Sequence, residues 1–155
     1  MGLWDKVKSV ANKITGGGAK VTLTVEGTEL KGTIKVHISA EIKDAPINVT
    51  KVYLYVRSVE RVNIPKNAMP SNSGAAAETG VTLDKEVYPQ TEFVVAGAQT
   101  LEGGKTYNWS YDLNLAGTTV PAYHGVYAHH EWQFFAGLDA PGNDPDSGWQ
   151  TVSLY

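Results

Sequence analysis

The sequence predicts an all-β protein, a single antiparallel β-sandwich preceded by one short helix. Three observations lead to this prediction. The length of 155 residues fits one hydrophobic core. After the first twenty residues, apolar and polar side chains alternate with the period of half-buried strands. Sixteen glycines and seven prolines supply the turns. We therefore expect residues 1–18 to form a helix with a glycine hinge, and residues 19–155 to form the sandwich.

The opening segment has the pattern of an amphipathic helix over residues 3–14. Its apolar stripe holds Leu3, Val7, Val10 and Ile14, with Trp4 beside it. A run of three glycines, 16–18, then ends the helix, because glycine adopts the backbone conformations that helix ends require. Two roles stay open for Leu3, Trp4 and Val7. The helix either docks on its own domain or contacts a partner or a membrane surface.

The strands follow the glycines. Strand signals occur at residues 21–25, 34–40, 52–56, 81–88, 91–96, 107–115, 125–138 and 149–154. Residues 63–80 break the alternation and are rich in small side chains, which predicts a long surface loop. Similar strands resume beyond it, so it is not a linker between domains. Val126 begins the inner face of the longest strand. Trp109 and Trp132 share the inward phase, and we expect both to be buried between two sheets.

Three aromatic residues have the opposite, outward phase: Tyr53, Tyr55 and Phe135. Exposed together on a monomer, they would mark an interaction surface. The alternative is that the opening helix or a loop covers them. The alternation of the strands alone does not choose between these two interpretations.

Composition excludes several classes of function. The net charge of −3 gives no basis for nucleic-acid binding. The chain has no cysteine, which excludes disulfides, thiolate metal sites and cysteine nucleophiles. No apolar run could span a bilayer, and the first residues lack the core of a signal peptide, so we expect a cytoplasmic protein. The motifs of serine hydrolases and phosphate-binding loops are missing. We expect no enzyme activity and no cofactor.

Two short stretches hold candidate metal ligands. His129 and Glu131 share one face of a strand, and His37 or His124 could add a third ligand. Asp144 and Asp146 lie in a turn that partly matches a calcium loop. A solvated polar face and an Asx turn explain the same residues without a metal. Neither ligand set is complete, so we predict no stoichiometric binding of zinc or calcium.

Several stretches resemble the arrestin fold and, within it, the bacterial sporulation-control protein family. They are the opening segment with Ala19-Lys20-Val21, and LKGTIKVHISAEIKDAPINVTKVYLYVRSVERV, TYNWSYDLNLAGTTVPAYHG and HHEWQFFAGLDAPGNDPDSGWQTVSLY. The resemblance implies an immunoglobulin-like sandwich that acts as a scaffold or regulatory binder, without catalytic residues. Arrestin-like proteins usually carry two sandwiches in tandem, whereas this chain has the length of one. The resemblance therefore does not extend to a function that needs the cleft between two sandwiches.

We expect a protein-binding module that uses a sheet edge or the outer aromatic residues. One alternative is self-assembly into a ring or filament. Residues 1–20 carry a charge of +3, from four lysines and Asp5, and residues 106–155 carry five acids and no base. A helix that met a neighbour's acidic turn, residues 139–148, would make a head-to-tail contact. The other alternative is a metal- or carbohydrate-binding module.

Overall fold

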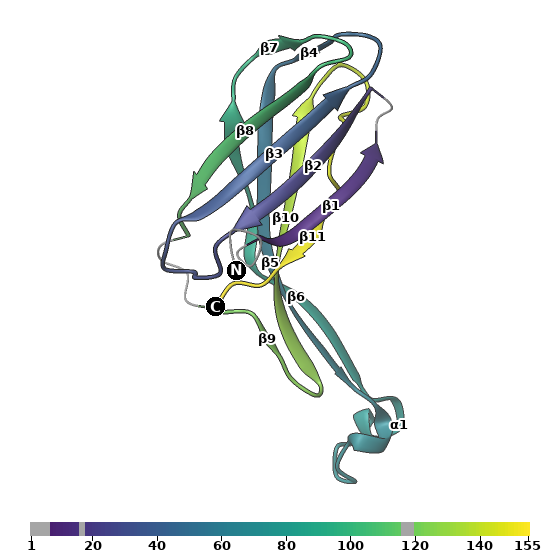
Figure 1. Ribbon diagram of the computed structural model, residues 1–155. Helices are drawn as coiled ribbons and strands as arrows, with labels where there is room; N and C mark the ends of the chain where they lie inside the picture. Colours follow the sequence, from purple (N-terminus) through teal and green to yellow (C-terminus); the bar gives the residue numbers. More distant parts are fainter. Residues whose placement is uncertain (1–6, 16–17, 116–119) are drawn as a thin grey trace.

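Two antiparallel sheets face each other in the computed structural model, which describes residues 7–15, 18–115 and 120–155, with side chains from residue 18 onward (Figure 1). The first sheet has the order β1-β2-β3-β8, with β1 (Val7–Thr15), β2 (Ala19–Glu26), β3 (Ile34–Ile42) and β8 (Thr106–Leu113). The second has the order β11-β10-β5-β6, with β11 (Gln150–Val152), β10 (Ala128–Asp139), β5 (Lys51–Ile64) and β6 (Val81–Ala96).

Smaller elements complete the fold. The short strand β9 (Tyr123–His124) pairs with β10, and β4 (Ile47–Val49) pairs with β7 (Gln99–Leu101). A 3-10 turn, η2 (Lys66–Ala68), and a single helical turn, α1 (Ala76–Thr79), lie in the loop between β5 and β6. None of the helices in the described part of the chain is long and apolar enough to cross a membrane.

The core lies between the two sheets, where the alternation of the sequence places it. Inward residues of β2 and β3 are fully or almost fully buried, among them Val21, Leu23, Val36 and Ile38. They face the inward residues of β5 and β10, including Leu54, Val56, Phe134 and Leu138. Side chains that alternate in this way give each strand one apolar and one polar face. The predicted all-β sandwich is confirmed.

The two inward tryptophans differ in burial. Trp132 is fully buried in the central strand β10, and its Nε1 donates a hydrogen bond to the Val120 carbonyl at 3.0 Å. Trp109 is only half-buried, with Tyr107 stacked at a centroid distance of 6.2 Å. The reason is position, because β8 is the last strand of the first sheet and its inward side chains are covered from one side only. The prediction of burial is right for Trp132 and right in part for Trp109.

The predicted helix over residues 3–14 is wrong where the structure describes it. Residues 7–15 form the strand β1, which pairs with β2 from Thr15↔Ala19 to Val7↔Glu26. A helix of about twelve residues is marginal without tertiary support, whereas β2 offers a free edge with a full set of backbone partners. The β-branched Val7, Val10 and Ile14 also suit a strand. Leu3 and Trp4 lie outside the described residues.

Other boundaries also depend on tertiary pairing. The stretches 81–88 and 91–96 form one strand, β6, whose register against β5 shifts at three points. The loop predicted at 63–80 is confirmed as the connection of the β5–β6 hairpin. Strand β10 begins only at Ala128, so Val126 lies before it and is 88% exposed, not inward as expected. The last strand is shorter than expected, Gln150–Val152, and the residues that follow it bond other segments: Leu154 pairs with Ala122, and Tyr155 pairs with Thr28 and Leu30.

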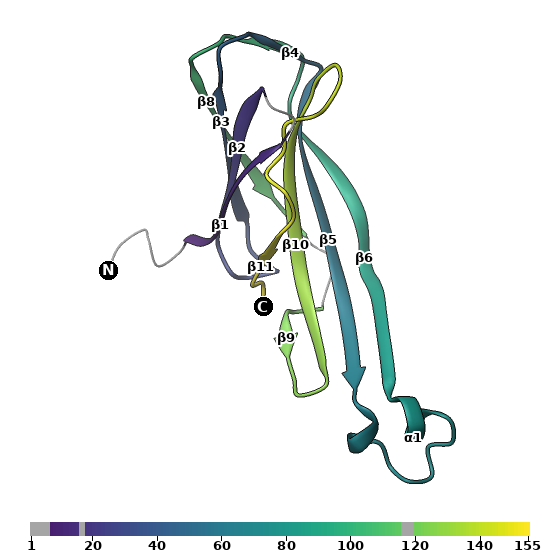
Figure 2. The same cartoon turned by 90° about the vertical axis from the view of Figure 1, so that its right-hand side faces the viewer.

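The second sheet is longer than the first. The β5–β6 hairpin and the β9–β10 hairpin continue past the end of the first sheet (Figure 2). We call this projecting part the overhang and define it as residues 59–64, 81–87 and 123–130. Its side that continues the core-facing surface, the inner face, has no strand of the first sheet opposite it, as both views show.

The difference in burial between the two tryptophans can be tested. We expect Trp132→Ala to lower the free energy of unfolding by about 3–5 kcal/mol, because it empties a closed core site. Trp109→Ala should cost less, on the order of 2 kcal/mol, because much of that ring is already in water. Chemical denaturation of both variants measures the losses. Equal losses in the free energy of unfolding would contradict the conclusion that Trp109 is partly exposed because β8 lies at the edge of its sheet.

Candidate functional site

The outward aromatic residues form a cluster on the outer face of the second sheet. Tyr53 and Tyr55 have ring centroids 4.9 Å apart, and Phe135 lies 5.9 Å from Tyr55. Trp149 adds a fourth ring, 5.2 Å from Phe135, and the Arg57 guanidinium sits 3.9 Å above the Trp149 ring. The rings are tilted against one another by 18° to 47°, so they make no flat platform of the kind that stacks on sugars.

A loop, not a helix, covers part of this cluster. The segment 140–149 folds back over β10, where the Leu138 amide donates to the Pro145 carbonyl at 3.0 Å. Tyr53 is 5% exposed and donates its hydroxyl proton to Asp144 at 3.0 Å. Gly137 makes room for the Tyr53 ring, because an added Cβ would lie 2.3 Å from the Tyr53 hydroxyl oxygen. Tyr55 and Phe135 stay half-exposed.

The two aspartates of the acidic turn hold this covering loop in place. Asp144 accepts hydrogen bonds from Tyr53 and from the Ala140 amide, and Asp146 accepts one from the Gly148 amide at 2.8 Å. Their carboxylates therefore bond groups of their own chain as an Asx-type turn does. The head-to-tail alternative assumes a helix, but residues 7–15 form a strand, and Asp144 and Asp146 of the acidic turn accept hydrogen bonds within their own chain.

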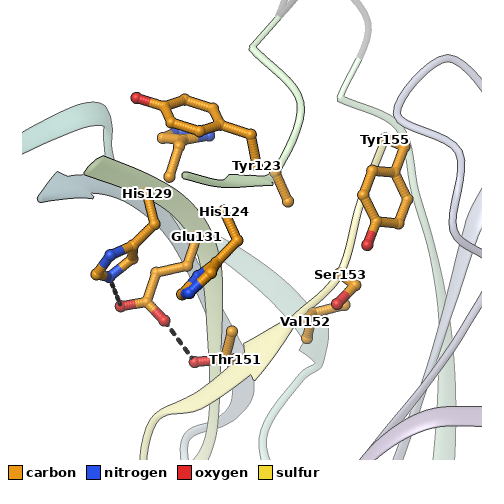
Figure 3. A pocket seen from close by; sticks show the side chains of 10 residues that line it. Tyr123, His124, His129, Glu131, Thr151, Val152, Ser153 and Tyr155 are labelled. Atoms are coloured by element: carbon orange, nitrogen blue, oxygen red, sulfur yellow. Dashed lines mark hydrogen bonds and ion pairs between the residues drawn. The ribbon is translucent and has the colours of Figure 1, made fainter. Parts of the chain in front are cut away.

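A second polar cluster lies on the outer face of the overhang. His124 of β9 and His129 of β10 are register partners with ring centroids 5.4 Å apart. Glu131 lies 3.9 Å from His129 Nε2 and accepts a 2.9 Å hydrogen bond from Thr151 (Figure 3). It also lies 3.3 Å from Arg61 Nη1. His129 and Glu131 share a face as expected. Within the residues that the structure describes, no three ligating side chains are grouped to hold a metal ion.

A shallow cleft of about 270 Å³ lies beside this cluster, at a notch in the second sheet. Both β9 and β11 pair with the same edge of β10, through Tyr123↔His130 and Val152↔Trp132, and the notch between them falls at Glu131. The cleft is lined on one side by the histidine cluster and on the other by residues 151–153 and Tyr155 (Figure 3). His130 faces the opposite side of β10, is buried, and bonds the Pro121 carbonyl.

A third polar group lies on the first sheet, on its solvent-facing side. His37 of β3 lies between Glu26, 2.7 Å from Nε2, and Ser110, 3.1 Å from Nδ1. In the neutral tautomer that carries its proton on Nε2, the ring donates to Glu26 and Nδ1 accepts from the Ser110 hydroxyl. The order carboxylate, imidazole, hydroxyl is that of a catalytic triad, but the two ring nitrogens are exchanged relative to it. It lies on an open sheet face with Ser110 exposed, far from the enclosed setting that such catalysis needs. His37 is therefore placed away from His129 and Glu131.

The inner face of the overhang is apolar beyond its first row. In that row Tyr123 donates to Glu60 at 2.9 Å across β10, and this hydrogen bond raises the pKa of the Tyr123 hydroxyl. The next rows pair Val62 with Leu83 and Ile64 with Val81. Leu83 is 51% exposed. These residues continue the inward phase of β5, where the sandwich has no second layer to receive them.

Sequence reasoning missed this surface, although its signal was present. Val62 and Ile64 extend the alternation that starts at Val52, and Val81 and Leu83 repeat it after the loop. The sequence could therefore show an apolar face. It could not show that the first sheet ends before reaching this face, because that depends on how the two sheets are aligned.

Comparison with known proteins supports the fold. No family model matches the sequence, and no curated protein sequence matches it. Among solved structures, the chain is similar to Spo0M, a sporulation control protein from Bacillus subtilis, with a TM-score of 0.59 and 17% sequence identity. The match covers 89% of this chain and 49% of that one, so the chain spans about half the length of Spo0M. The fold is thus similar to that of Spo0M, in agreement with the resemblance to the sporulation-control proteins that the sequence showed.

The bond between Tyr53 and Asp144 gives a pH-dependent prediction. Burial, strengthened by Asp144, raises the pKa of Tyr53 above its ordinary value of about 10. A raised pKa contributes stability that is present below about pH 10 and lost as the pH rises further. Tyr53→Phe should cost about 0.5–1.5 kcal/mol at neutral pH, and this cost should shrink above about pH 10.

Urea denaturation at neutral and alkaline pH measures both effects. Tyr55→Phe is the matched control, since it removes a hydroxyl from the same cluster but no bond of the covering loop. A cost for Tyr53→Phe that stays constant with pH would show that the hydrogen bond to Asp144 is not formed in solution.

Proposed function

We propose that this chain is a non-catalytic protein-binding module of arrestin-like type, and that the inner face of the overhang is its binding surface. One observation carries the proposal. The apolar side chains of the overhang follow the same alternation as the core residues of β5, but the first sheet ends before it reaches them. In the rest of the molecule this phase builds the core. A partner that covers the face would supply the missing second layer.

The chemistry of the surface indicates what kind of partner fits. Its centre is apolar, with Val62, Leu83, Ile64 and Val81 in two adjacent rows. Its border toward the sandwich is charged, because Glu60 and Lys85 are register partners on the same face. Burial of apolar area supplies the affinity, at about 25 cal/mol per Å², and the charged border sets orientation. The partner is a protein that presents an apolar strip with polar margins.

The polar clusters support binding over catalysis. Glu131 is held by Arg61 and Thr151, and Asp144 holds a loop. The triad-like group of Glu26, His37 and Ser110 lies on an open face of the first sheet. We therefore expect Ser110 to stay unlabelled by an organophosphate that reacts with activated serines. Labelling of Ser110 that is lost in His37→Ala would contradict the non-catalytic assignment.

A pair of matched variants tests the binding surface. Leu83→Asp places a charge on the inner face, whereas Val94→Asp changes an equally exposed residue of the same strand, 55% against 51%, whose register partner Tyr53 lies on the outer face. We expect a partner captured from the native cell extract to bind Leu83→Asp at least about tenfold more weakly, a loss of about 1.4 kcal/mol or more.

The control should bind the partner like the unmodified protein, and both variants should keep their melting temperature. A partner that is retained by Leu83→Asp but lost by Val94→Asp would move the binding surface to the outer face and end the proposal.

A further inference from the structure

Edge strands are the places where a sheet can add a further strand, and this sandwich protects its edges unequally. Strand β6 contains Pro89 and shifts of register, and the charged run Asp84-Lys85-Glu86 lies in it. Strand β11 has three residues. Strand β1 has a shift of register near its start and contains Lys8 and Lys13. Proline, irregular register, charge and short length are the usual means of blocking strand addition.

Strand β8 has the weakest protection of these edges. It pairs with β3 over eight consecutive residues without a shift of register, from Thr106↔Glu41 to Leu113↔Ile34. It contains no proline and a single charged residue, Asp112. Among the described residues, no strand pairs with its other side. Every second backbone N–H and C=O of β8 is therefore directed outward, as in any terminal antiparallel strand.

The side chains of β8 add a reason to pair. Tyr107, Trp109 and Tyr111 lie on the inward face and are half-buried, because the sheet ends beside them. Strand β6 approaches this margin at Phe93, whose ring lies 5.9 Å from Tyr111. An added strand would cover the remaining exposed surface of these rings. It would need apolar residues on the same face as the rings and, on the other face, no acidic residue directly opposite Asp112.

A second copy of β8 meets these requirements. In an antiparallel pair, residues directly opposite each other share a face, so only registers that place odd-numbered opposite odd-numbered residues keep the rings together. The register centred on Trp109 sets Tyr107 opposite Tyr111 and Asn108 opposite Ser110. The register centred on Ser110 sets Trp109 opposite Tyr111 and Asn108 opposite Asp112. Neither register opposes like charges.

We propose that the chain forms a two-fold symmetric dimer in which two β8 strands pair antiparallel and join the first sheets of both copies into one continuous sheet. Such a contact is isologous and closes on itself, so it gives a dimer and not a filament. It uses the least protected edge and buries half-exposed aromatic surface of both copies. The overhang stays free, so the dimer would present two partner-binding faces.

Size-exclusion chromatography with light scattering, run on the full chain at several concentrations, tests whether the dimer forms. The unmodified protein should shift from monomer to dimer as concentration rises. Asn108→Lys/Asp112→Lys, which places lysines at the seam of both copies, should raise the dissociation constant at least about tenfold. Asn72→Lys/Glu78→Lys makes the same kinds of change at exposed positions in the β5–β6 loop and should leave the constant unchanged.

Cross-linking locates the seam, because the natural chain has no cysteine. Asn108→Cys/Ser110→Cys should form intermolecular disulfides in the register centred on Trp109, and Asn108→Cys/Asp112→Cys in the one centred on Ser110. A protein that stays monomeric at all concentrations, or a dimer unaffected by the seam lysines, would overturn the proposal. Leu83→Asp should leave the dimer intact, so failure here is separable from failure of the overhang as a binding face.

Discussion

The unequal length of the two sheets is the constraint on which the rest of this structure depends. Strands β5 and β10 pair over twelve consecutive residues and form the central ladder of the second sheet. The first sheet covers only part of this ladder (Figure 2). Where it does, the inward residues make a core with Trp132 and Phe134 fully buried. Where it does not, side chains on the same face of the second sheet are exposed to solvent, as Leu83 is. Core and candidate binding face are thus two parts of one continuous surface.

The polar residues that first drew attention hold the structure together. Asp144 and Asp146 fix the loop that covers Tyr53, and Glu131 joins β5, β10 and β11 through Arg61 and Thr151. Among the described residues, the inner face of the overhang and the outer edge of β8 are the two surfaces proposed for recognition. A face selects partners by shape and apolar area, whereas an edge selects any strand of compatible alternation. The two proposed surfaces are separate, so use of one would not block the other.

The sequence predicts the fold well because alternation is a local property. The alternation from Val21 to Val25 and from Val52 to Val56 predicts strands with one buried face. The resemblance found in the sequence agrees with the structural similarity to Spo0M. The failures concern properties that pairing decides. Residues 7–15 carry a helical spacing, but the free edge of β2 makes them a strand. The cover over Tyr53 and the exposure of Leu83 depend on where a loop and a sheet end, which no local pattern encodes.

The most direct test of this account is the accessibility of the inner face in the free protein. A single cysteine at position 83 (Leu83→Cys) can be compared with one at the buried position Ala136 (Ala136→Cys), since the chain has no other thiol. The account predicts that the thiol at 83 reacts with a thiol reagent at nearly the rate of an unfolded control, whereas the thiol at 136 reacts orders of magnitude more slowly. Equal protection at both positions would mean that the inner face is already covered, and would contradict the central claim.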